Sequence, residues 1–241
     1  MFSDAKFTFI CAKTQHKMKK NMIKYVIFDL DGTLLDTMED IAGACNHALK
    51  CCGCPAREIG EYNQFIGSGI YNLFRRALPE DRRDEETVMM MHKHFIPYYN
   101  DHICDRTKPY EGICDMLDRL SEQGIRFAVA SNKYQEGTEK LVQKFFARYG
   151  FVSILGQKDG FPIKPDPLII IEAMKSMPGI EKDEVIYCGD SDVDMQTGIN
   201  AGVRTIGVTW GFRSREELSA YGPWLLAGSP EEISRAILAE K

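Results

Sequence analysis

Two acidic residues directly follow a short apolar run near the start of the chain. Residues 25–28, Tyr-Val-Ile-Phe, are rich in β-formers, as expected of a strand buried on both faces. Asp29 and Asp31 come next, and Gly32 ends the strand. Side chains alternate along a strand, so the two acids begin on the same side, and a bend at Gly32 can separate their tasks. Acids at the carboxyl end of a parallel strand lie where open α/β sheets bind ligands. The run therefore predicts a ligand site, with a solvated turn as the alternative.

Three further motifs follow, and two of them also end apolar runs. They are Ser131-Asn132-Lys133 after residues 127–130, Lys164 between the prolines of residues 162–167, and Gly189-Asp190-Ser191-Asp192-Val193-Asp194 after residues 185–188. A lone lysine in a proline-containing loop is usually a surface residue. Its place in an ordered series with three other motifs argues for a functional role.

Together, and in this order, the four motifs resemble those of the haloacid dehalogenase-like superfamily, whose members are mostly phosphohydrolases. The resemblance extends from Met22 to the C-terminus. It implies an α/β fold with a Rossmann-like core, in which helices cover both faces of a parallel sheet. It also implies a helical cap domain inserted after the first strand.

The resemblance assigns a catalytic role to several of these residues. Asp29 would be the nucleophile that forms an aspartyl-phosphate, which splits hydrolysis into two easier steps. Asp31 would protonate the leaving alkoxide and then take a proton from water. Ser131 and the amide of Asn132 would bind the phosphate, and Lys164 would neutralise one of its oxygens.

The same resemblance implies a Mg²⁺ site. The ion would be held by the carboxylates of Asp29 and Asp190 and by the main-chain carbonyl of Asp31. Mg²⁺ prefers such oxygen ligands and usually retains several waters. Thr33 would support the site, and Asp194 would orient water or the motif lysine. Asp192 is interpreted as a solvated residue or a helix start.

The periodicity of the remaining chain suggests two units. From Pro109 onward, strand and helix patterns alternate, which is typical of βαβ units and a parallel sheet. Between residues 37 and 105 only helical patterns occur, and the predicted helices cover residues 38–50, 70–78 and 85–96, the last ending before Pro97. We therefore expect a loosely ordered tail (residues 1–21), a core (22–36 and 106–241) and a helical cap (37–105).

The cap offers two candidates for substrate specificity. The loop Gly67-Ser68-Gly69 resembles the glycine-containing loop by which such caps approach the active site, although it could be an ordinary turn. Arg75 could bind a substrate carboxylate through two hydrogen bonds. The alternative for Arg75 and the adjacent Arg76 is a solvated helix face.

Composition and charge narrow the class of protein. The net charge of −5 argues weakly against a nucleic-acid-binding surface. No apolar run approaches the ~20 residues that a membrane-spanning helix needs. The apolar residues 7–12 precede most of the nearby lysines, the reverse of a secretory signal. The eight cysteines lack zinc-ligand spacing and are expected as free thiols of a cytoplasmic monomer or homodimer.

These observations favour a Mg²⁺-dependent phosphatase that hydrolyses a small phosphorylated metabolite. Secondary cues at residues 36–37, 109–112 and 210–213 resemble the phosphoglycolate phosphatase group. A β-phosphoglucomutase-type phosphotransferase shares the same core and stays open as an alternative. A catalytically inactive interaction protein would normally carry a damaged motif, and a dehalogenase needs no Mg²⁺ site; the intact motifs count against both.

Overall fold

The computed structural model describes residues 22–240. Its main sheet has the strand order β5-β4-β1-β6-β7-β8, and every neighbouring pair of strands is parallel. The strands are β1 (Tyr25–Phe28), β4 (Arg126–Tyr134), β5 (Ser153–Gln157), β6 (Val185–Gly189), β7 (Arg204–Val208) and β8 (Leu225–Ala227). This arrangement confirms the predicted α/β fold with a parallel sheet.

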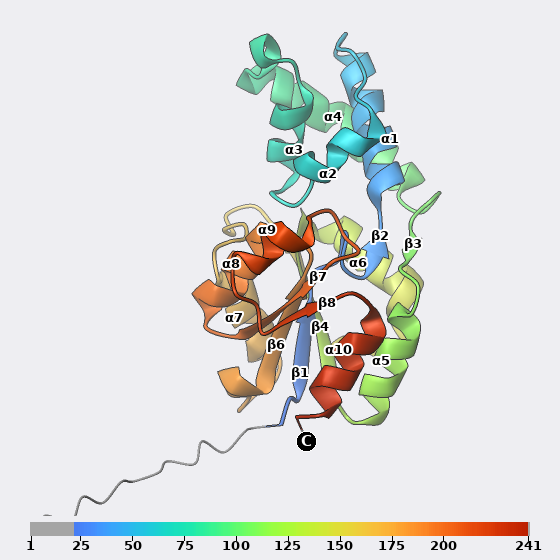
Figure 1. Ribbon diagram of the computed structural model, residues 1–241. Helices are drawn as coiled ribbons and strands as arrows, with labels where there is room; N and C mark the ends of the chain where they lie inside the picture. Colours follow the sequence, from blue (N-terminus) through green and yellow to red (C-terminus); the bar gives the residue numbers. More distant parts are fainter. Residues whose placement is uncertain (1–21, 241) are drawn as a thin grey trace, which may run out of the picture.

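Helices cover both faces of the sheet (Figure 1). They are α5 (Ile113–Glu122), α6 (Gln135–Phe146), α7 (Leu168–Lys175), α8 (Asp192–Ala201), α9 (Arg215–Ser219) and α10 (Pro230–Leu238), with 3-10 turns η3 (Ala147–Tyr149) and η4 (Lys182–Glu184). Val26 and Phe28 of β1 pack in the cluster that includes α5, α6 and α10, whereas Tyr25 and Ile27 pack with α7 and α8. Because side chains alternate along the strand, each of its two faces packs against a separate apolar layer.

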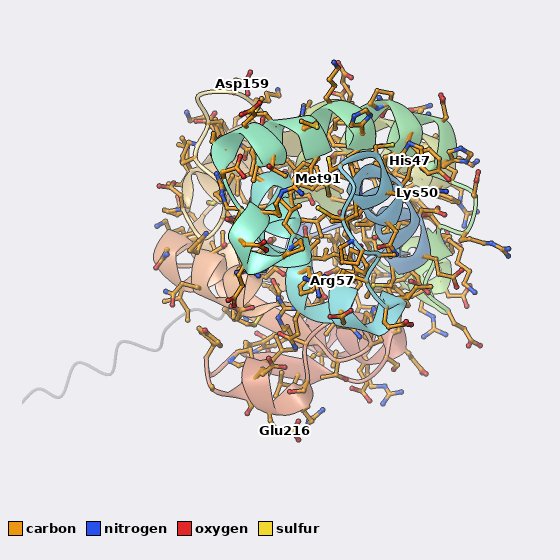
Figure 2. The ribbon with its side chains drawn as sticks, turned by 90° about the horizontal axis from the view of Figure 1, so that it is seen from above. His47, Lys50, Arg57, Met91, Asp159 and Glu216 are labelled. Atoms are coloured by element: carbon orange, nitrogen blue, oxygen red, sulfur yellow. The ribbon has the colours of Figure 1, made fainter. Side chains whose placement is uncertain are left out.

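A helical unit lies between the first two stretches of the core sequence and sits beyond the carboxyl end of the sheet (Figure 1). We call this unit, residues 37–105, the cap. Its elements are α1 (Met38–Cys51), η1 (Ile59–Glu61), α2 (Tyr62–Phe65), α3 (Ile70–Ala77), η2 (Glu80–Arg82) and α4 (Glu85–His102). Seen from above, the cap helices cover the middle of the core, and Asp159 and Glu216 lie at its margins (Figure 2).

Two antiparallel strands connect the cap to the core. They are β2 (Leu35–Asp36) and β3 (Lys108–Pro109), one on each connecting segment. The buried carboxylate of Asp40 fastens this connection, because it accepts hydrogen bonds from the backbone N–H groups of Arg106 and Thr107 and from the Thr107 hydroxyl, at 2.7–3.1 Å. The start of α1 is therefore tied to the segment by which the chain returns to the core.

One helix differs clearly from the sequence prediction. The expectation that Pro97 ends a helix at residue 96 is wrong, because α4 continues to His102 with Pro97 inside it. Proline removes one hydrogen-bond donor and clashes with the preceding turn, which normally disfavours a helix interior. Here Pro97 is exposed, while Phe95 and Tyr99 on either side of it are buried in the core cluster shared with α1. Tertiary packing on this face outweighs the local cost.

Other differences concern element ends and short elements. Helix α8 begins at Asp192, one of the two interpretations of that residue, because Ser191 caps the helix by accepting a hydrogen bond from the N–H of Asp194. Ser229 caps α10 in the same way, by accepting a hydrogen bond from the N–H of Glu232. The sequence pattern did not predict α2, α9, β8 or the β2–β3 pair, because each of these elements has five residues or fewer. The tail expected at residues 1–21 lies outside the described residues.

Candidate active site

The register of the three central strands brings the motifs to one edge of the sheet. Phe28 of β1 is paired with Val129 of β4 and with Cys188 of β6. Asp29, Ser131 and Asp190 follow these positions by one or two residues, so they emerge side by side. All three are buried, with relative exposures of 6%, 2% and 1%. Polar groups so close to the core require partners, and neighbouring segments supply them.

Lys164 is the centre of the most buried charge network. Its ammonium lies 2.8 Å from Oδ1 of Asp29 and 2.7 Å from Oδ1 of Asp194, and it also contacts the hydroxyl of Tyr187 at 2.9 Å. Burial by itself lowers the pKa of Lys164, but Asp194 and Asp29 outweigh burial and raise it. The lysine is therefore a permanent cation at this edge.

The two carboxylates paired with Lys164 differ electrostatically. Burial acts to raise the pKa of Asp194, but Lys164 and hydrogen bonds from Ser191 and Tyr187 lower it overall. Burial raises the pKa of Asp29 to about 7, although Lys164 opposes this shift. The Oδ2 atom of Asp29 has no hydrogen-bond partner within residues 22–240. Asp194 is thus fully engaged, whereas Asp29 keeps one oxygen for a ligand.

Asp29, Asp190 and Asp194 each place an oxygen within 4.8 Å of the others. Burial, followed by repulsion from Asp194 and Asp29, raises the pKa of Asp190 well above its usual value. Hard carboxylate oxygens crowded at low exposure are a donor set that fits Mg²⁺. Because Asp194 is already occupied by Lys164, Ser191 and Tyr187, Asp29 and Asp190 are the two carboxylates suited to hold a cation.

Two glycines make room for Asp190. A Cβ on Gly211 would lie 2.3 Å from the Asp190 Cβ and 2.4 Å from the Gly32 carbonyl oxygen. Gly32 has φ +86°, and its Cβ would lie 2.3 Å from Asp190 Oδ2. The backbone N–H of Phe212 donates to that oxygen at 2.7 Å, and the Thr33 hydroxyl to Oδ1 at 3.3 Å. The loop after β7 therefore holds the Asp190 carboxylate in place through the N–H of Phe212.

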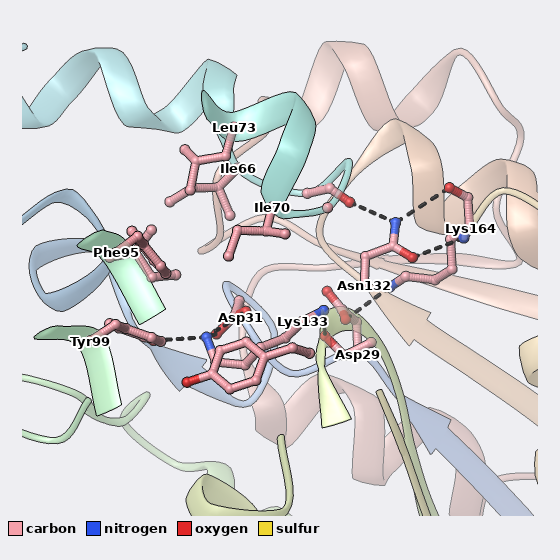
Figure 3. A pocket seen from close by; sticks show the side chains of 15 residues that line it. Asp29, Asp31, Ile66, Ile70, Leu73, Phe95, Tyr99, Asn132, Lys133 and Lys164 are labelled. Atoms are coloured by element: carbon pink, nitrogen blue, oxygen red, sulfur yellow. Dashed lines mark hydrogen bonds and ion pairs between the residues drawn. The ribbon is translucent and has the colours of Figure 1, made fainter. Parts of the chain in front are cut away.

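Asp31 is paired with Lys133, a residue of the second motif to which the sequence analysis assigned no role. The ammonium of Lys133 lies 3.0 and 3.1 Å from the two carboxylate oxygens of Asp31 and 2.7 Å from the hydroxyl of Tyr99 on α4 (Figure 3). The Lys133 side chain is 4% exposed. Strand alternation could have revealed Lys133, because it is two residues after Ser131 on β4. No local pattern marks Tyr99, which reaches the site only through cap folding.

The cap contacts the site through its glycine-containing loop. Asn132 donates from its side-chain amide to the carbonyl oxygens of Gly67, at 3.0 Å, and Lys164, at 3.3 Å, and it accepts from the Lys164 N–H at 2.8 Å. Arg213, from the loop after β7, donates to the carbonyl oxygens of Asn63 and Ile66. Core side chains therefore hold the cap loop directly over the carboxyl edge of the sheet.

A cavity lies between the cap and the core. Its floor consists of Asp29, Asp31, Ser131, Asn132, Lys133, Tyr134 and Lys164. Its cap side consists mainly of apolar residues, namely Ile41, Ile66, Ile70, Leu73 and Phe95, together with Gly67, Gly69 and Tyr99 (Figure 3). The site is thus polar below and apolar above.

Two candidates from the sequence do not line this cavity. Arg75 forms an ion pair with Glu85 at 2.8 Å, and both side chains are exposed. The Ser68 hydroxyl accepts a hydrogen bond from Arg76 at 3.1 Å. The loop reaches the cavity through Gly67 and Gly69 alone. Arg75 lies elsewhere because it is on the solvent side of α3, whereas Leu73 of the same helix faces the cavity.

The family profile of haloacid dehalogenase-like hydrolases matches residues 26–208, which include all four motifs. The chain belongs to this family. It is 31% identical to the phosphoglycolate phosphatase of Aquifex aeolicus over 79% of its own length and 86% of that protein. It is 32% identical to the phosphoglycolate phosphatase of Neisseria meningitidis over 87% of its length and 92% of that protein.

Solved structures agree with this membership. A crystal structure of a candidate phosphoglycolate phosphatase from Lactobacillus delbrueckii subsp. bulgaricus has a TM-score of 0.83, is 33% identical, and is matched over 90% of this chain and 99% of its own. A crystal structure of a candidate phosphatase from Clostridium acetobutylicum has a TM-score of 0.78, is 29% identical, and is matched over 91% of this chain and 100% of its own. This haloacid dehalogenase-like hydrolase is a phosphoric monoester hydrolase. None of its helices within residues 22–240 is long and apolar enough to cross a membrane.

Proposed function

We propose that this hydrolase is a Mg²⁺-dependent phosphatase that cleaves a small, phosphoglycolate-like monoester through an aspartyl-phosphate on Asp29. The observation that carries the proposal is the pairing of Asp29 with Lys164 at 2.8 Å on the cavity floor. This contact positions a carboxylate beside a fixed cation, and its second oxygen stays available for the phosphorus.

In the first step, an oxygen of Asp29 attacks phosphorus and the bond from phosphorus to the alkoxide oxygen breaks. For this step Asp31 must carry a proton when the ester is bound; it gives that proton to the alkoxide oxygen, and the alcohol leaves. In the second step, Asp31 takes a proton from water, the water oxygen attacks phosphorus, and the bond to Asp29 breaks. Ser131 and Lys164 line the same floor and offer a hydroxyl donor and a positive charge to the phosphoryl oxygens.

Asp29 and Asp190 would hold Mg²⁺ with the carbonyl oxygen of Asp31. When bound, the ion would neutralise negative charge on the phosphoryl group and on the clustered carboxylates. The rest of the site uses residues of this chain: Asp194 and Tyr187 keep Lys164 in position, and Phe212 and Thr33 hold Asp190. The cap covers the floor with apolar side chains and thereby limits access of water to it.

The test measures phosphate release from 2-phosphoglycolate, 4-nitrophenyl phosphate and glucose 6-phosphate, with Mg²⁺ and with excess chelator. We expect Mg²⁺-dependent hydrolysis that is fastest with 2-phosphoglycolate, and phosphorylation of Asp29 in protein quenched during turnover. Interconversion of β-glucose 1-phosphate and glucose 6-phosphate is measured beside it. Interconversion that exceeds phosphate release about tenfold in kcat/KM, about 1.4 kcal/mol, would make the protein a mutase instead.

A further inference from the structure

The cationic side chains that line the cavity limit where a negatively charged leaving group can bind. Within the described residues, Lys133 and Lys164 are the only cationic side chains that line the cavity. Lys164 is committed to Asp29 and Asp194 beneath the phosphate position. The cationic cap residues Arg75 and Lys93 are exposed and do not line it, and Arg76 binds carbonyl oxygens of the cap. Lys133 is therefore the cation that remains for a second negative group on a substrate.

We propose that Lys133 and Tyr99 form the subsite that receives a carboxylate on the leaving group of the substrate. This proposal rests on the proposed phosphatase function and assigns the substrate class: a short phosphomonoester with a carboxylate close to the ester oxygen. Lys133 lies on β4 in the same floor as Ser131, and Tyr99 extends from α4 toward it (Figure 3). The subsite thus spans the boundary between core and cap.

The hydrogen-bonding capacity of the two side chains fits a carboxylate. The Asp31 oxygens lie at nearly equal distances from the Lys133 ammonium, 3.0 and 3.1 Å, so one of its three hydrogens can serve both. A second hydrogen goes to the Tyr99 hydroxyl oxygen at 2.7 Å, which leaves one for a ligand. The Tyr99 hydroxyl accepts this bond and donates to no acceptor within residues 22–240.

Burial keeps Tyr99 in the donor form. Burial and then the negative charge of Asp31 raise its pKa well above the usual value, so the phenol stays protonated. A carboxylate between the two groups would accept one hydrogen bond from the ammonium and one from the phenol. Hydrogen bonds to a charged group are the stronger kind.

The surrounding wall argues against a polyhydroxylated leaving group. Ile66, Ile70, Leu73 and Phe95 face the space above the floor and carry no polar side-chain atoms. Sugar hydroxyls placed there would lose their hydrogen bonds to water without replacement. A short carboxylated chain avoids this loss, because its one charged group lies at Lys133 and Tyr99.

The experiment compares kcat/KM for 2-phosphoglycolate with kcat/KM for its carboxamide, in which a neutral amide replaces the carboxylate. The variants are K133M, Y99F and, as a matched control, K93M on the exposed side of α4. The ratio of the two constants is the readout, because a general disturbance of Asp31 lowers both. We expect the wild type to prefer the carboxylate by about tenfold to hundredfold, the range of a charged hydrogen bond. K133M should lose this preference, Y99F part of it and K93M none.

A wild type that hydrolyses both esters equally, or a K133M variant that keeps the ratio, would overturn the carboxylate subsite and leave the phosphatase function intact. If K133M does not fold, an unchanged ratio in Y99F overturns the proposal. A wild type that releases phosphate from no ester in the presence of Mg²⁺ refutes the proposed function, and this inference with it.

Discussion

The two sides of the cavity differ in chemistry and in how the chain builds them. The floor rests on a network of buried charges in which Lys164 joins Asp29 and Asp194, and backbone and hydroxyl donors hold the neighbouring Asp190. The cap wall is apolar and comes from α1, α3 and α4. Fixed charges suit phosphoryl transfer, which depends on positioning and charge neutralisation. Apolar walls select by size and by the cost of burying polar groups. On the proposed function, the floor carries out the reaction and the wall selects the leaving group that fits.

Lys133 and Tyr99 form a polar contact between the charged floor and the apolar cap wall. One belongs to the floor and the other to the cap, and the hydrogen bond between them is 2.7 Å long. The cap therefore places one of its residues next to a floor cation. We expect changes in the floor to have larger effects than a change in the contact between Arg213 and the cap.

The largest effect is expected from D29N. The amide keeps the shape of the side chain but is no nucleophile, so kcat should fall by at least about 10³-fold, as removal of other nucleophiles does. Phosphate release is measured together with the melting temperature, and D101N on the exposed side of α4 serves as control. Near-wild-type turnover in D29N, after deamidation to Asp has been excluded by mass spectrometry, would contradict the covalent route.

K164M tests whether the floor depends on its central cation. Removing one partner from a buried ion pair leaves uncompensated charge, which typically costs about 3–5 kcal/mol in the free energy of unfolding. Denaturant unfolding measures this cost, and kcat should fall by about a hundredfold or more, as after the loss of a preorganised donor. R75M removes an exposed ion pair of the cap and should change stability by less than about 1 kcal/mol. Equal losses in the two variants would refute the contrast.

The pH dependence of Mg²⁺ binding probes the carboxylates of the floor. Because burial raises the pKa of Asp29 to about 7, the folded metal-free protein holds this proton more tightly than the unfolded chain does. Its stability contribution is thus full below the ordinary carboxyl pKa of about 4 and is lost as the pH rises from there through 7. Mg²⁺ binds the deprotonated carboxylate, so the rise in melting temperature on adding Mg²⁺ should be larger at pH 8 than at pH 5.5. D190N should abolish most of this rise; an equal rise at both pH values would argue against Asp29 as a ligand.

R213M tests the contact between the core and the cap, and it should have the smallest effect on activity. Arg213 holds the carbonyl oxygens of Asn63 and Ile66, and its loss should loosen the cap while Asp29 and Lys164 remain in place. We expect KM to rise by about tenfold with a smaller change in kcat, as for the loss of one charged hydrogen bond. Hydrogen exchange of residues 63–67 should become faster, whereas the exposed R215M control should leave both unchanged. A fall in kcat alone would assign Arg213 to the chemistry.

The sequence determined the floor because strand ends are local features. An apolar run followed by Asp29 or by Asp190 predicts a strand and the acid at its end, and parallel strands present these ends at one edge. The same logic gave Ser131. Lys133 was within reach of this argument, because it shares a strand with Ser131. Short elements such as β8 and α9 contain too few residues for a periodic pattern to emerge.

Only the tertiary structure decided the cap wall and its contacts. Whether Leu73 or Arg75 faces the cavity depends on how α3 packs against α4 and the core, and both are compatible with one amphipathic helix. The packing of α4 also carries the helix through Pro97 and brings Tyr99 to Lys133, 34 residues away in the sequence. Periodicity identifies an apolar stripe but not its partner. The class of reaction could therefore be predicted from residues at strand ends, whereas the cap residues that line the cavity depend on contacts between distant segments.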